Sequence, residues 1–253
     1  MFGTSHFESH HHNGFEYLKI SKGTEDSESL VFLHGMFGGL SNYDALVEYI
    51  DDYNIYVPSI PLYEFKARKL TFTNMAKWLH SFLEALEIEN PILLGNSMGG
   101  HLALEYTVQH PENVAALILT GSSGLQERDF GSTFPRRNDR DYVRNQAAIT
   151  FYDDDFVTEE LMDEIMEVIN DRSNLLNVLA IARETHEYSM EDYLPDIEQE
   201  VLLIWGKQDE ITPPEVAEEF HKALPNSRLK WIDKCGHAPM MEHPEKFALY
   251  LNE

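Results

Sequence analysis

Ile92-Leu93-Leu94-Gly95-Asn96-Ser97-Met98-Gly99-Gly100 is the stretch that decides the fold of this 253-residue chain. The apolar run 92–94 predicts a buried strand, and the residues from Gly100 to Tyr106 are typical of a helix. Between them, Gly95-Asn96-Ser97-Met98-Gly99 forms a Gly-x-Ser-x-Gly pattern, in which small residues allow strand and helix to approach closely. Such a turn exposes the serine hydroxyl at a helix N-terminus, where the helix dipole and free N–H groups favour negative charge.

The segments before this turn alternate between expected strands and helices. Asn13-Gly14 predicts a hairpin whose return strand is 15–20, and this places His10-His11-His12 on a solvent-facing strand rather than in a metal site. The remaining elements expected before the turn are a strand at 30–33, a helix capped by Asn42, a strand at 54–57 and a helix carrying Met75, Leu79, Phe82, Leu83 and Leu86.

Beyond the turn, a strand at 114–119 is followed by a change of pattern. No strand is expected from Gln126 to Pro195, where Thr158 and Ser173 each begin an amphipathic helix, the second with Leu176, Leu179 and Ala180 on one face. The alternation then resumes with a strand at 201–205, a helix at 213–224, a strand at 229–232 and a helix from Pro244. This order predicts an α/β fold whose mostly parallel sheet has helices on both faces.

Composition narrows the class of protein. The 43% hydrophobic content is enough to bury a full core, and 44 acidic residues against 19 Lys and Arg give a formal charge of −25. Nucleic acid and anionic membranes are therefore not expected partners. No apolar run approaches the roughly 18 residues of a membrane span, and neither a signal peptide nor an intrachain disulfide of the single Cys235 is expected. We expect a cytoplasmic protein.

Two further polar residues follow predicted strands and complete a catalytic set with Ser97. A serine hydroxyl is a weak nucleophile that needs a histidine as base and an acid to orient that histidine. Asp209 lies just past the strand at 201–205, and His237 lies just past the strand at 229–232. Because the carboxyl ends of parallel strands share one edge, Ser97, Asp209 and His237 are expected to converge there.

Each of these assignments has an alternative. Ser97 competes with a role as a simple helix N-cap, Asp209 with Glu210 and with a turn aspartate, and His237 with His221 and His243. The loop His34-Gly35-Met36-Phe37-Gly38-Gly39 ends a strand at the same edge, so the backbone N–H groups of Met36 and Met98 are the expected oxyanion-hole donors. His34 is expected to shape this loop, and Cys235 to be a packed side chain.

Together these motifs resemble the α/β-hydrolase superfamily over nearly the full chain. The matching pieces are the His34-Gly35 loop, the turn at 95–100, the acid loop at 206–213, and Gly236-His237 followed by Glu242-His243-Pro244-Glu245. The resemblance implies an eight-stranded sheet, a helical lid inserted after the sixth strand, and ester-type hydrolysis with neither a metal nor an organic cofactor. We therefore expect a core domain at 1–125 and 196–253 and a helical cap at 126–195.

The expected cap carries residues that fit either a pocket wall or its own core. The apolar ones are Phe130, Phe134, Tyr142, Ile149, Phe151, Met162, Met166 and Leu176. The arginines at 128, 136, 137, 140 and 144 either hold a substrate carboxylate or pair with Asp129, Asp139, Asp141 and Asp153 to Asp155.

The favoured function is a carboxylesterase-type serine hydrolase that binds a small or medium ester under the lid and forms an acyl-enzyme. The alternatives with the same triad are a carbon–carbon bond hydrolase and a cofactor-free perhydrolase or haloperoxidase. A non-enzymatic small-molecule receptor with the same fold is the competing class. The sequence sets neither the substrate nor the oligomeric state.

Overall fold

One sheet organises the chain, which a computed structural model describes at residues 7–125 and 139–253. Within these ranges eight strands pair in the order β1-β2-β4-β3-β5-β6-β7-β8, and the pairs β1–β2 and β2–β4 are antiparallel while the others are parallel. The strands are β1 (Ser9–His12), β2 (Phe15–Ser21), β3 (Ser29–Leu33), β4 (Asn54–Pro58), β5 (Ile92–Asn96), β6 (Ala116–Thr120), β7 (Glu200–Gly206) and β8 (Ser227–Ile232). The expected mostly parallel sheet is confirmed.

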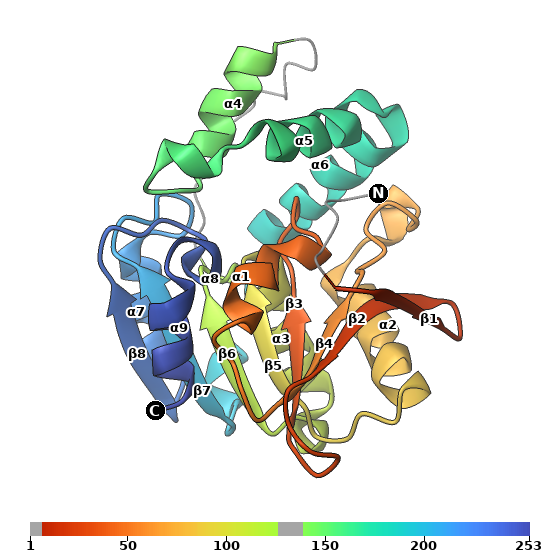
Figure 1. Ribbon diagram of the computed structural model, residues 1–253, viewed down its shortest axis with the longest axis vertical. Helices are drawn as coiled ribbons and strands as arrows, with labels where there is room; N and C mark the ends of the chain where they lie inside the picture. Colours follow the sequence, from red (N-terminus) through yellow and green to blue (C-terminus); the bar gives the residue numbers. More distant parts are fainter. Residues whose placement is uncertain (1–6, 126–138) are drawn as a thin grey trace.

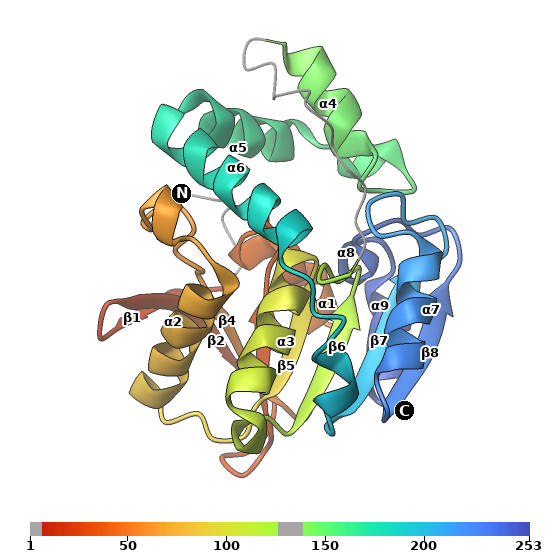
Figure 2. The same ribbon diagram turned by 180° about the vertical axis from the view of Figure 1, so that it is seen from behind.

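Helices cover both faces of this sheet (Figures 1 and 2). The α-helices are α1 (Asp44–Val47), α2 (Phe72–Ala85), α3 (Met98–Gln109), α4 (Arg140–Ala148), α5 (Glu159–Asn170), α6 (Arg172–Glu187), α7 (Pro214–Ala223), α8 (Pro239–Glu242) and α9 (Pro244–Leu251). Short 3₁₀ turns are η1 (Leu40–Tyr43), η2 (Ala67–Lys69), η3 (Pro111–Asn113), η4 (Asp154–Phe156) and η5 (Leu194–Asp196). Helices α2, α3 and α7 pack on one face, and α1, α8 and α9 on the other.

The central strands are apolar on both sides, because each supplies residues to both core layers. In β7, Leu203 and Trp205 face the α2, α3 and α7 layer, whereas Leu202 and Ile204 face the α1, α8 and α9 layer. All four are buried. This is why the sequence pattern shows continuous apolar runs in place of simple alternation.

The N-terminal hairpin forms as the sequence predicts. Asn13 and Gly14 take positive φ values of 50° and 85°, and β1 pairs with β2 with His12 opposite Phe15. The strand that carries His10, His11 and His12 is exposed along its whole length, in agreement with the solvent-facing interpretation.

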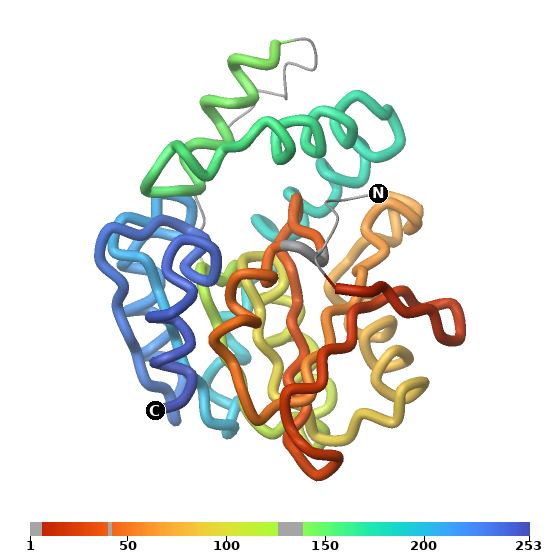
Figure 3. The backbone as a smooth tube through the Cα atoms, in the orientation of Figure 1, coloured from red at the N-terminus to blue at the C-terminus, as the bar shows by residue number. Residues whose placement is uncertain are grey.

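Helices α4, α5 and α6 lie between β6 and β7 in the chain, and Figures 1 and 3 show them above one edge of the sheet. They share their own small core of Val143, Val157, Met162, Ile165, Ile169 and Leu175. Phe37, from the loop after β3, packs against this cluster, as do Tyr142, Phe151 and Met166. These last three, with Met162, therefore belong to the packing of the segment itself. Phe130 and Phe134, which we named as candidates for the pocket wall or the cap core, lie outside the described residues.

Two expected helix starts are wrong. Asn42 accepts a hydrogen bond from the Gly39 N–H at 3.2 Å and so closes a loop turn, while α1 begins two residues later without a side-chain cap. Helix α6 is capped by Asp171, whose carboxylate accepts from Asn174 N, rather than by Ser173. By contrast, Thr158 caps α5 through Leu161 N as expected.

The shift in the start of α6 also corrects the apolar face that we expected. Leu175 is only 4% exposed in the core of the α4–α6 segment, whereas Leu176 is 52% exposed. The next residue, Asn177, is buried, and its side-chain amide donates to Leu62 O and Phe65 O at 2.7 and 2.8 Å. These bonds satisfy the amide and so allow it to be buried. These two hydrogen bonds fix α6 to the core below it, and a polar anchor of this kind gives no apolar signal in the sequence.

We predict that these neighbouring leucines differ sharply in their effect on stability. Leu175→Ala should lower the free energy of unfolding by about 2–5 kcal/mol, because it leaves a cavity in the segment's core. Leu176→Ala should change it by less than about 0.5 kcal/mol, because the side chain is largely in water. Urea denaturation of both variants measures the difference, and equal losses would contradict this assignment of the buried face.

Candidate active site

Ser97 occupies the sharp turn between β5 and α3 that the sequence predicts. Its φ of 55° and ψ of −122° are unusual for a residue with a side chain, and its side chain makes no capping hydrogen bond to α3. The main chain holds this conformation: Ser97 N donates to Thr120 O at 3.2 Å, and Ser97 O accepts from Gly100 N at 2.9 Å. The alternative role of Ser97 as a side-chain N-cap is therefore wrong.

The glycines of the turn are required by close approach. A Cβ atom on Gly95 would lie 2.5 Å from Gly100 Cα, and one on Gly99 would collide with the carbonyl oxygen of Leu33 at the end of β3. Only glycine lets α3 pack this tightly over the strands. The same packing sets the N-terminus of α3, which begins with Met98, directly after Ser97.

Asp209 and His237 form a buried hydrogen-bonded pair. His237 Nδ1 lies 2.9 Å from Asp209 Oδ2 and 3.1 Å from Asp209 Oδ1. His237 is 5% exposed and Asp209 is 3% exposed. A carboxylate only accepts hydrogen bonds, so His237 carries a proton on Nδ1, and in the neutral ring Nε2 is then the acceptor. This tautomer is the one that a general base needs.

Thr212 orients the Asp209 carboxylate, a role that sequence reasoning missed. Thr212 Oγ1 donates to Asp209 Oδ2 at 2.9 Å, and the N–H groups of Ile211 and Thr212 donate to Oδ1 at 2.9 and 3.0 Å. Thr212 is itself fully buried, and its carbonyl accepts from Trp205 Nε1 at 2.9 Å. The Asp-x-x-Thr spacing is a local signal for this arrangement, because a side chain three residues on can reach back to the carboxylate.

The histidine loop is tied to the serine turn through Asn96. Its amide donates to Thr120 O and to His237 O, each at 3.0 Å, so one side chain links β5, β6 and the loop after β8. Gly121, directly after β6, lies so close that an added Cβ would be 2.7 Å from His237 Nδ1. The ends of β5, β6, β7 and β8 therefore meet at one place, as the parallel sheet requires.

The loop after β3 lies against the same turn. An added Cβ on Gly35 would be 3.4 Å from Ser97 Cβ. His34 stabilises this loop with both ring nitrogens: Nδ1 donates to Gly35 O at 2.8 Å, and Nε2 accepts from Ile60 N at 3.2 Å. Burial lowers the pKa of His34, which keeps it neutral in this role. Met36 follows, with its carbonyl accepting from Tyr63 Oη at 3.3 Å.

The sequence profile of the alpha/beta hydrolase fold matches residues 28–244. The chain belongs to the α/β-hydrolase family. The crystal structure of MGS-MChE2, an alpha/beta hydrolase enzyme from the sediment metagenome of the Mar Chica lagoon, Morocco, is 38% identical with a TM-score of 0.78, covering 97% of this chain and 96% of that one.

Two curated relatives of this α/β hydrolase carry more specific names. Monoacylglycerol lipase ABHD6 from Mus musculus is 26% identical over 267 residues, covering 94% of this chain and 79% of its own. The 2-hydroxy-6-oxononadienedioate/2-hydroxy-6-oxononatrienedioate hydrolase from Paraburkholderia phymatum is 28% identical over 243 residues, covering 87% and 84%. The family is thus secure, while the named relatives differ in substrate.

The residues that compete with Asp209 and His237 for the roles of acid and base lie outside the buried Asp209–His237 pair. Glu210 is exposed beside the buried Asp209. His221 Nδ1 lies 2.8 Å from Ser227 Oγ, and His243 Nε2 lies 2.7 Å from Lys234 O. Cys235 is fully buried, and burial raises the pKa of its thiol, which agrees with a packed side chain.

Of the five cap arginines named above, the structure describes Arg140 and Arg144, and both form ion pairs with partners other than those expected. Arg140 Nη2 lies 2.6 Å from Glu159 and 2.7 Å from Asp163, and Arg144 also pairs with Glu159. Pairing is thus the outcome for these two residues, and helix α5 supplies the carboxylates. The arginines at 128, 136 and 137 lie outside the described residues.

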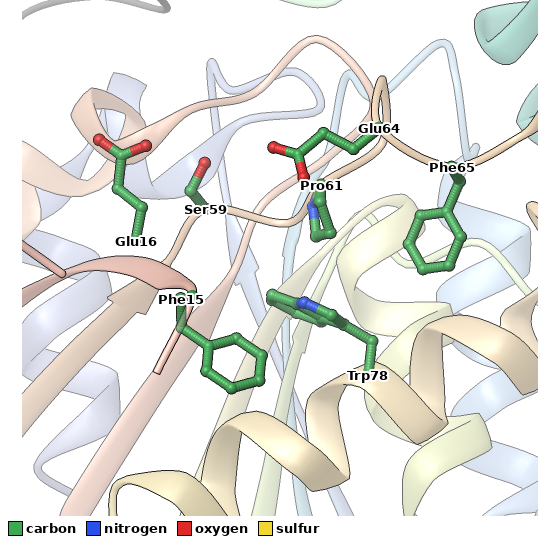
Figure 4. A pocket seen from close by; sticks show the side chains of 8 residues that line it. Phe15, Glu16, Ser59, Pro61, Glu64, Phe65 and Trp78 are labelled. Carbon is green, nitrogen blue, oxygen red and sulfur yellow. The ribbon is translucent and has the colours of Figure 1, made fainter. Parts of the chain in front are cut away.

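A surface pocket of about 350 Å³, which we call the flank pocket, lies between the N-terminal hairpin, the loop after β4 and helix α2 (Figure 4). Phe15 and Trp78 stand in edge-to-face contact at its floor, and the carboxylates of Glu16 and Glu64 lie along its rim. Its remaining lining residues are Gly14, Ser59, Pro61 and Phe65. None of Ser97, Asp209 and His237 lines this pocket, so it is separate from the candidate active site.

In residues 7–125 and 139–253, no helix combines the length and apolarity needed to cross a bilayer. Over the same residues, no three His, Cys, Asp or Glu side chains are grouped to hold a metal ion.

His101 lies one turn into α3 and is buried behind Ser97. It is 0% exposed, its ring stacks on Phe72 with centroids 3.6 Å apart, and its Nδ1 lies 3.4 Å from Ser123 Oγ. Ser123 in turn donates to Ser97 O at 3.3 Å. Burial lowers the pKa of His101 to about 3, so it is neutral in the folded protein near neutral pH.

We predict that His101 makes the protein less stable in acid. Below about pH 6.5 the unfolded chain binds a proton at His101 that the folded chain does not bind until about pH 3, so stability falls by about 1 kcal/mol per pH unit in that window. His101→Phe keeps the ring and removes the titration, and its stability should therefore fall less steeply. Urea denaturation between pH 4 and 7 measures both slopes, with the exposed His221→Phe as control. Equal slopes for wild type and His101→Phe would contradict the prediction.

Proposed function

We propose that this α/β hydrolase is a serine hydrolase of carboxylesterase type, with Ser97 as nucleophile, His237 as general base and Asp209 as the acid that orients His237. The observation that carries the proposal is the buried Asp209–His237 pair, fixed by Asn96 to the strained turn that presents Ser97. A strained serine at a helix N-terminus, a histidine in the basic tautomer and a carboxylate behind it are the parts that acyl transfer needs.

In this mechanism His237 Nε2 takes the Ser97 hydroxyl proton as the serine oxygen attacks the carbonyl carbon of an ester. The negative charge that develops on the carbonyl oxygen is stabilised by the backbone N–H groups of Met98 and Met36. Protonated His237, stabilised by Asp209, then gives the proton to the departing alcohol. Water, activated by the same histidine, hydrolyses the acyl-enzyme and restores the serine. Every step uses groups of the protein and water alone.

The cap at 126–195, of which α4, α5 and α6 are described, serves as the lid over this site. Its position over the carboxyl edge of the sheet supports that role (Figure 1). So do two contacts with the catalytic loops: His237 N donates to Thr150 O at 2.7 Å, and Phe37 from the oxyanion loop packs on the α4–α6 cluster. A lid of this kind excludes water and shapes the acyl pocket.

The proposed substrate is a small or medium carboxylic ester. The names of the two relatives give two further substrates to test. They are a monoacylglycerol, from the name of the lipase, and 2-hydroxy-6-oxononadienedioate, from the name of the second hydrolase. Steady-state turnover of p-nitrophenyl esters, a monoacylglycerol and this dienedioate distinguishes the ester reaction from its alternative. Turnover of the dienedioate alone would replace the ester assignment.

We predict that Ser97→Ala lowers ester turnover by at least about 10³-fold, because it removes the nucleophile. A fluorophosphonate should label Ser97 in the wild type, with the adduct located by peptide mass spectrometry, and should leave Ser97→Ala unlabelled. Ser59→Ala, a serine of the separate flank pocket, is the control and should behave as wild type. Labelling of Ser97 without turnover of any substrate in the panel would indicate a receptor in place of an enzyme.

We further predict that kcat/KM rises with pH across about pH 6 to 7.5, the range in which a histidine loses its proton and becomes a base. Initial rates on a p-nitrophenyl ester, with product measured at one fixed pH after quenching, give the profile. A flat profile over this range would argue against His237 as the general base.

A further inference from the structure

The loop that carries His237 lies directly against the segment 150–152, which joins α4 to the rest of the cap. His237 N donates to Thr150 O at 2.7 Å. Gly236 approaches the same segment so closely that an added Cβ would be 2.7 Å from Thr150 O and 2.9 Å from the Phe151 carbonyl carbon. The two segments therefore touch main chain to main chain, with no side chain between them.

One carboxylate bridges these two segments. Glu242, the last residue of α8, accepts a hydrogen bond from Gly236 N on Oε1 at 2.9 Å and one from Tyr152 N on Oε2 at 2.7 Å. Its own main chain is fixed by a bond from Glu242 N to Ala238 O at 3.0 Å. Each oxygen thus serves a different segment, one on each side of the contact.

The carboxylate of Glu242 is held by main-chain donors and by the Cys235 thiol, which donates to Oε1 at 3.7 Å. Among the residues described, no lysine or arginine lies within ion-pair distance of it. Burial raises the pKa of Glu242, while hydrogen bonds from the backbone of Tyr152 and Gly236 act in the opposite direction. Hydrogen bonds from N–H groups to a carboxylate are shorter and stronger than those between neutral groups. A carboxylate, whose two oxygens share the negative charge, can therefore accept hydrogen bonds from Gly236 N and Tyr152 N at the same time.

We propose that Glu242 is a positioning residue for His237: its carboxylate clamps the histidine loop to the cap at 150–152 and so sets the imidazole in its place for catalysis. This inference rests on the serine-hydrolase function proposed above. Asp209 fixes the imidazole from its Nδ1 side, and Asn96 and Thr150 hold the His237 main chain. Glu242 adds the hold on Gly236, the residue just before the histidine.

The hydrogen bonds of Glu242 couple the position of the cap to the position of His237, the proposed general base. Phe151 packs against both the α4–α6 cluster and the core layer of α1, α8 and α9. The segment 150–152 therefore contacts both the cap and the core domain. A movement of this part of the cap must therefore carry the histidine loop along or break the bonds to Glu242 and Thr150. Substrate that displaces the cap would in this way alter the position of His237.

Glu242→Gln tests the clamp with almost no change in shape. The amide keeps one acceptor oxygen but turns an NH₂ group toward a main-chain N–H, so one of the two bonds is lost. A displacement of about 1 Å at a catalytic group costs up to about 100-fold in rate, so we expect kcat to fall by about 10- to 100-fold. KM should change by less than about 3-fold, because Glu242 does not touch the substrate. The matched control is Glu245→Gln, an exposed glutamate in the first turn of α9 that removes the same charge.

Three readouts separate positioning from a merely structural role. In Glu242→Gln, kcat should fall with KM nearly constant, the midpoint of the kcat/KM pH profile should shift by at least about half a unit, and phosphonylation of Ser97 should slow in parallel with kcat. Glu245→Gln should match the wild type in all three. If kcat and the pH midpoint of Glu242→Gln stay at wild-type values, the proposal is wrong. Ser97→Ala, measured beside them, reports separately on the serine-hydrolase function, since an active Ser97→Ala protein would overturn that function whatever Glu242 does.

A second variant covers the case in which Glu242→Gln does not fold. Glu242→Asp keeps the charge but is one methylene shorter, so its carboxylate reaches only one of the two N–H groups. We expect a smaller fall in kcat, of about 3- to 10-fold, together with faster hydrogen exchange of the amides of Gly236 and Tyr152. Unchanged exchange at both amides with unchanged kcat would overturn the clamp.

Discussion

The left-handed main chain of Ser97 is the constraint on which the candidate active site depends. A residue with a side chain in this region costs about 1–3 kcal/mol and persists only where its surroundings over-determine it. Here the surroundings are the bonds from Ser97 N to Thr120 O and from Gly100 N to Ser97 O, and the contact of Gly95 and Gly99 with neighbouring backbone. The strain thus fixes where α3 begins, and with it the place of the Met98 amide.

Buried polar groups around this turn are held mainly by main-chain donors and acceptors. Asp209 accepts from two backbone N–H groups, His34 bonds to a carbonyl and an N–H, and the half-buried Glu242 bridges two N–H groups. Because a buried carboxylate without partners is very costly, each of these contacts is specific to one geometry. The exposed pairs of Arg140 with Glu159 and Asp163 contribute little by comparison, since water and salt screen them.

Predictions from the sequence were correct where the interaction that fixes the structure joins residues close together in the chain. The Asn13-Gly14 hairpin and the Thr158 cap of α5 depend on residues within a few positions of each other. Asn42 and Ser173 also look like caps, but Asn42 bonds back into its own loop and Asp171 takes the capping place two residues before Ser173. A one-residue change in the face of α6 exposes Leu176 and buries Asn177, because Asn177 finds two carbonyls in a segment more than a hundred residues away.

The sequence alone determined the order of strands and helices, the serine turn, and the positions of the acid and the histidine after β7 and β8. The period of apolar residues, the spacing of glycines and the ends of strands can each be recognised from residues that are contiguous in the chain. Only the tertiary structure decided two of the groups that hold them: Asn96 on the His237 carbonyl, and Glu242 between Gly236 and Tyr152. Each of these side chains bonds to backbone atoms, which are the same in every residue, so no side-chain pattern in the sequence marks where the contacts form.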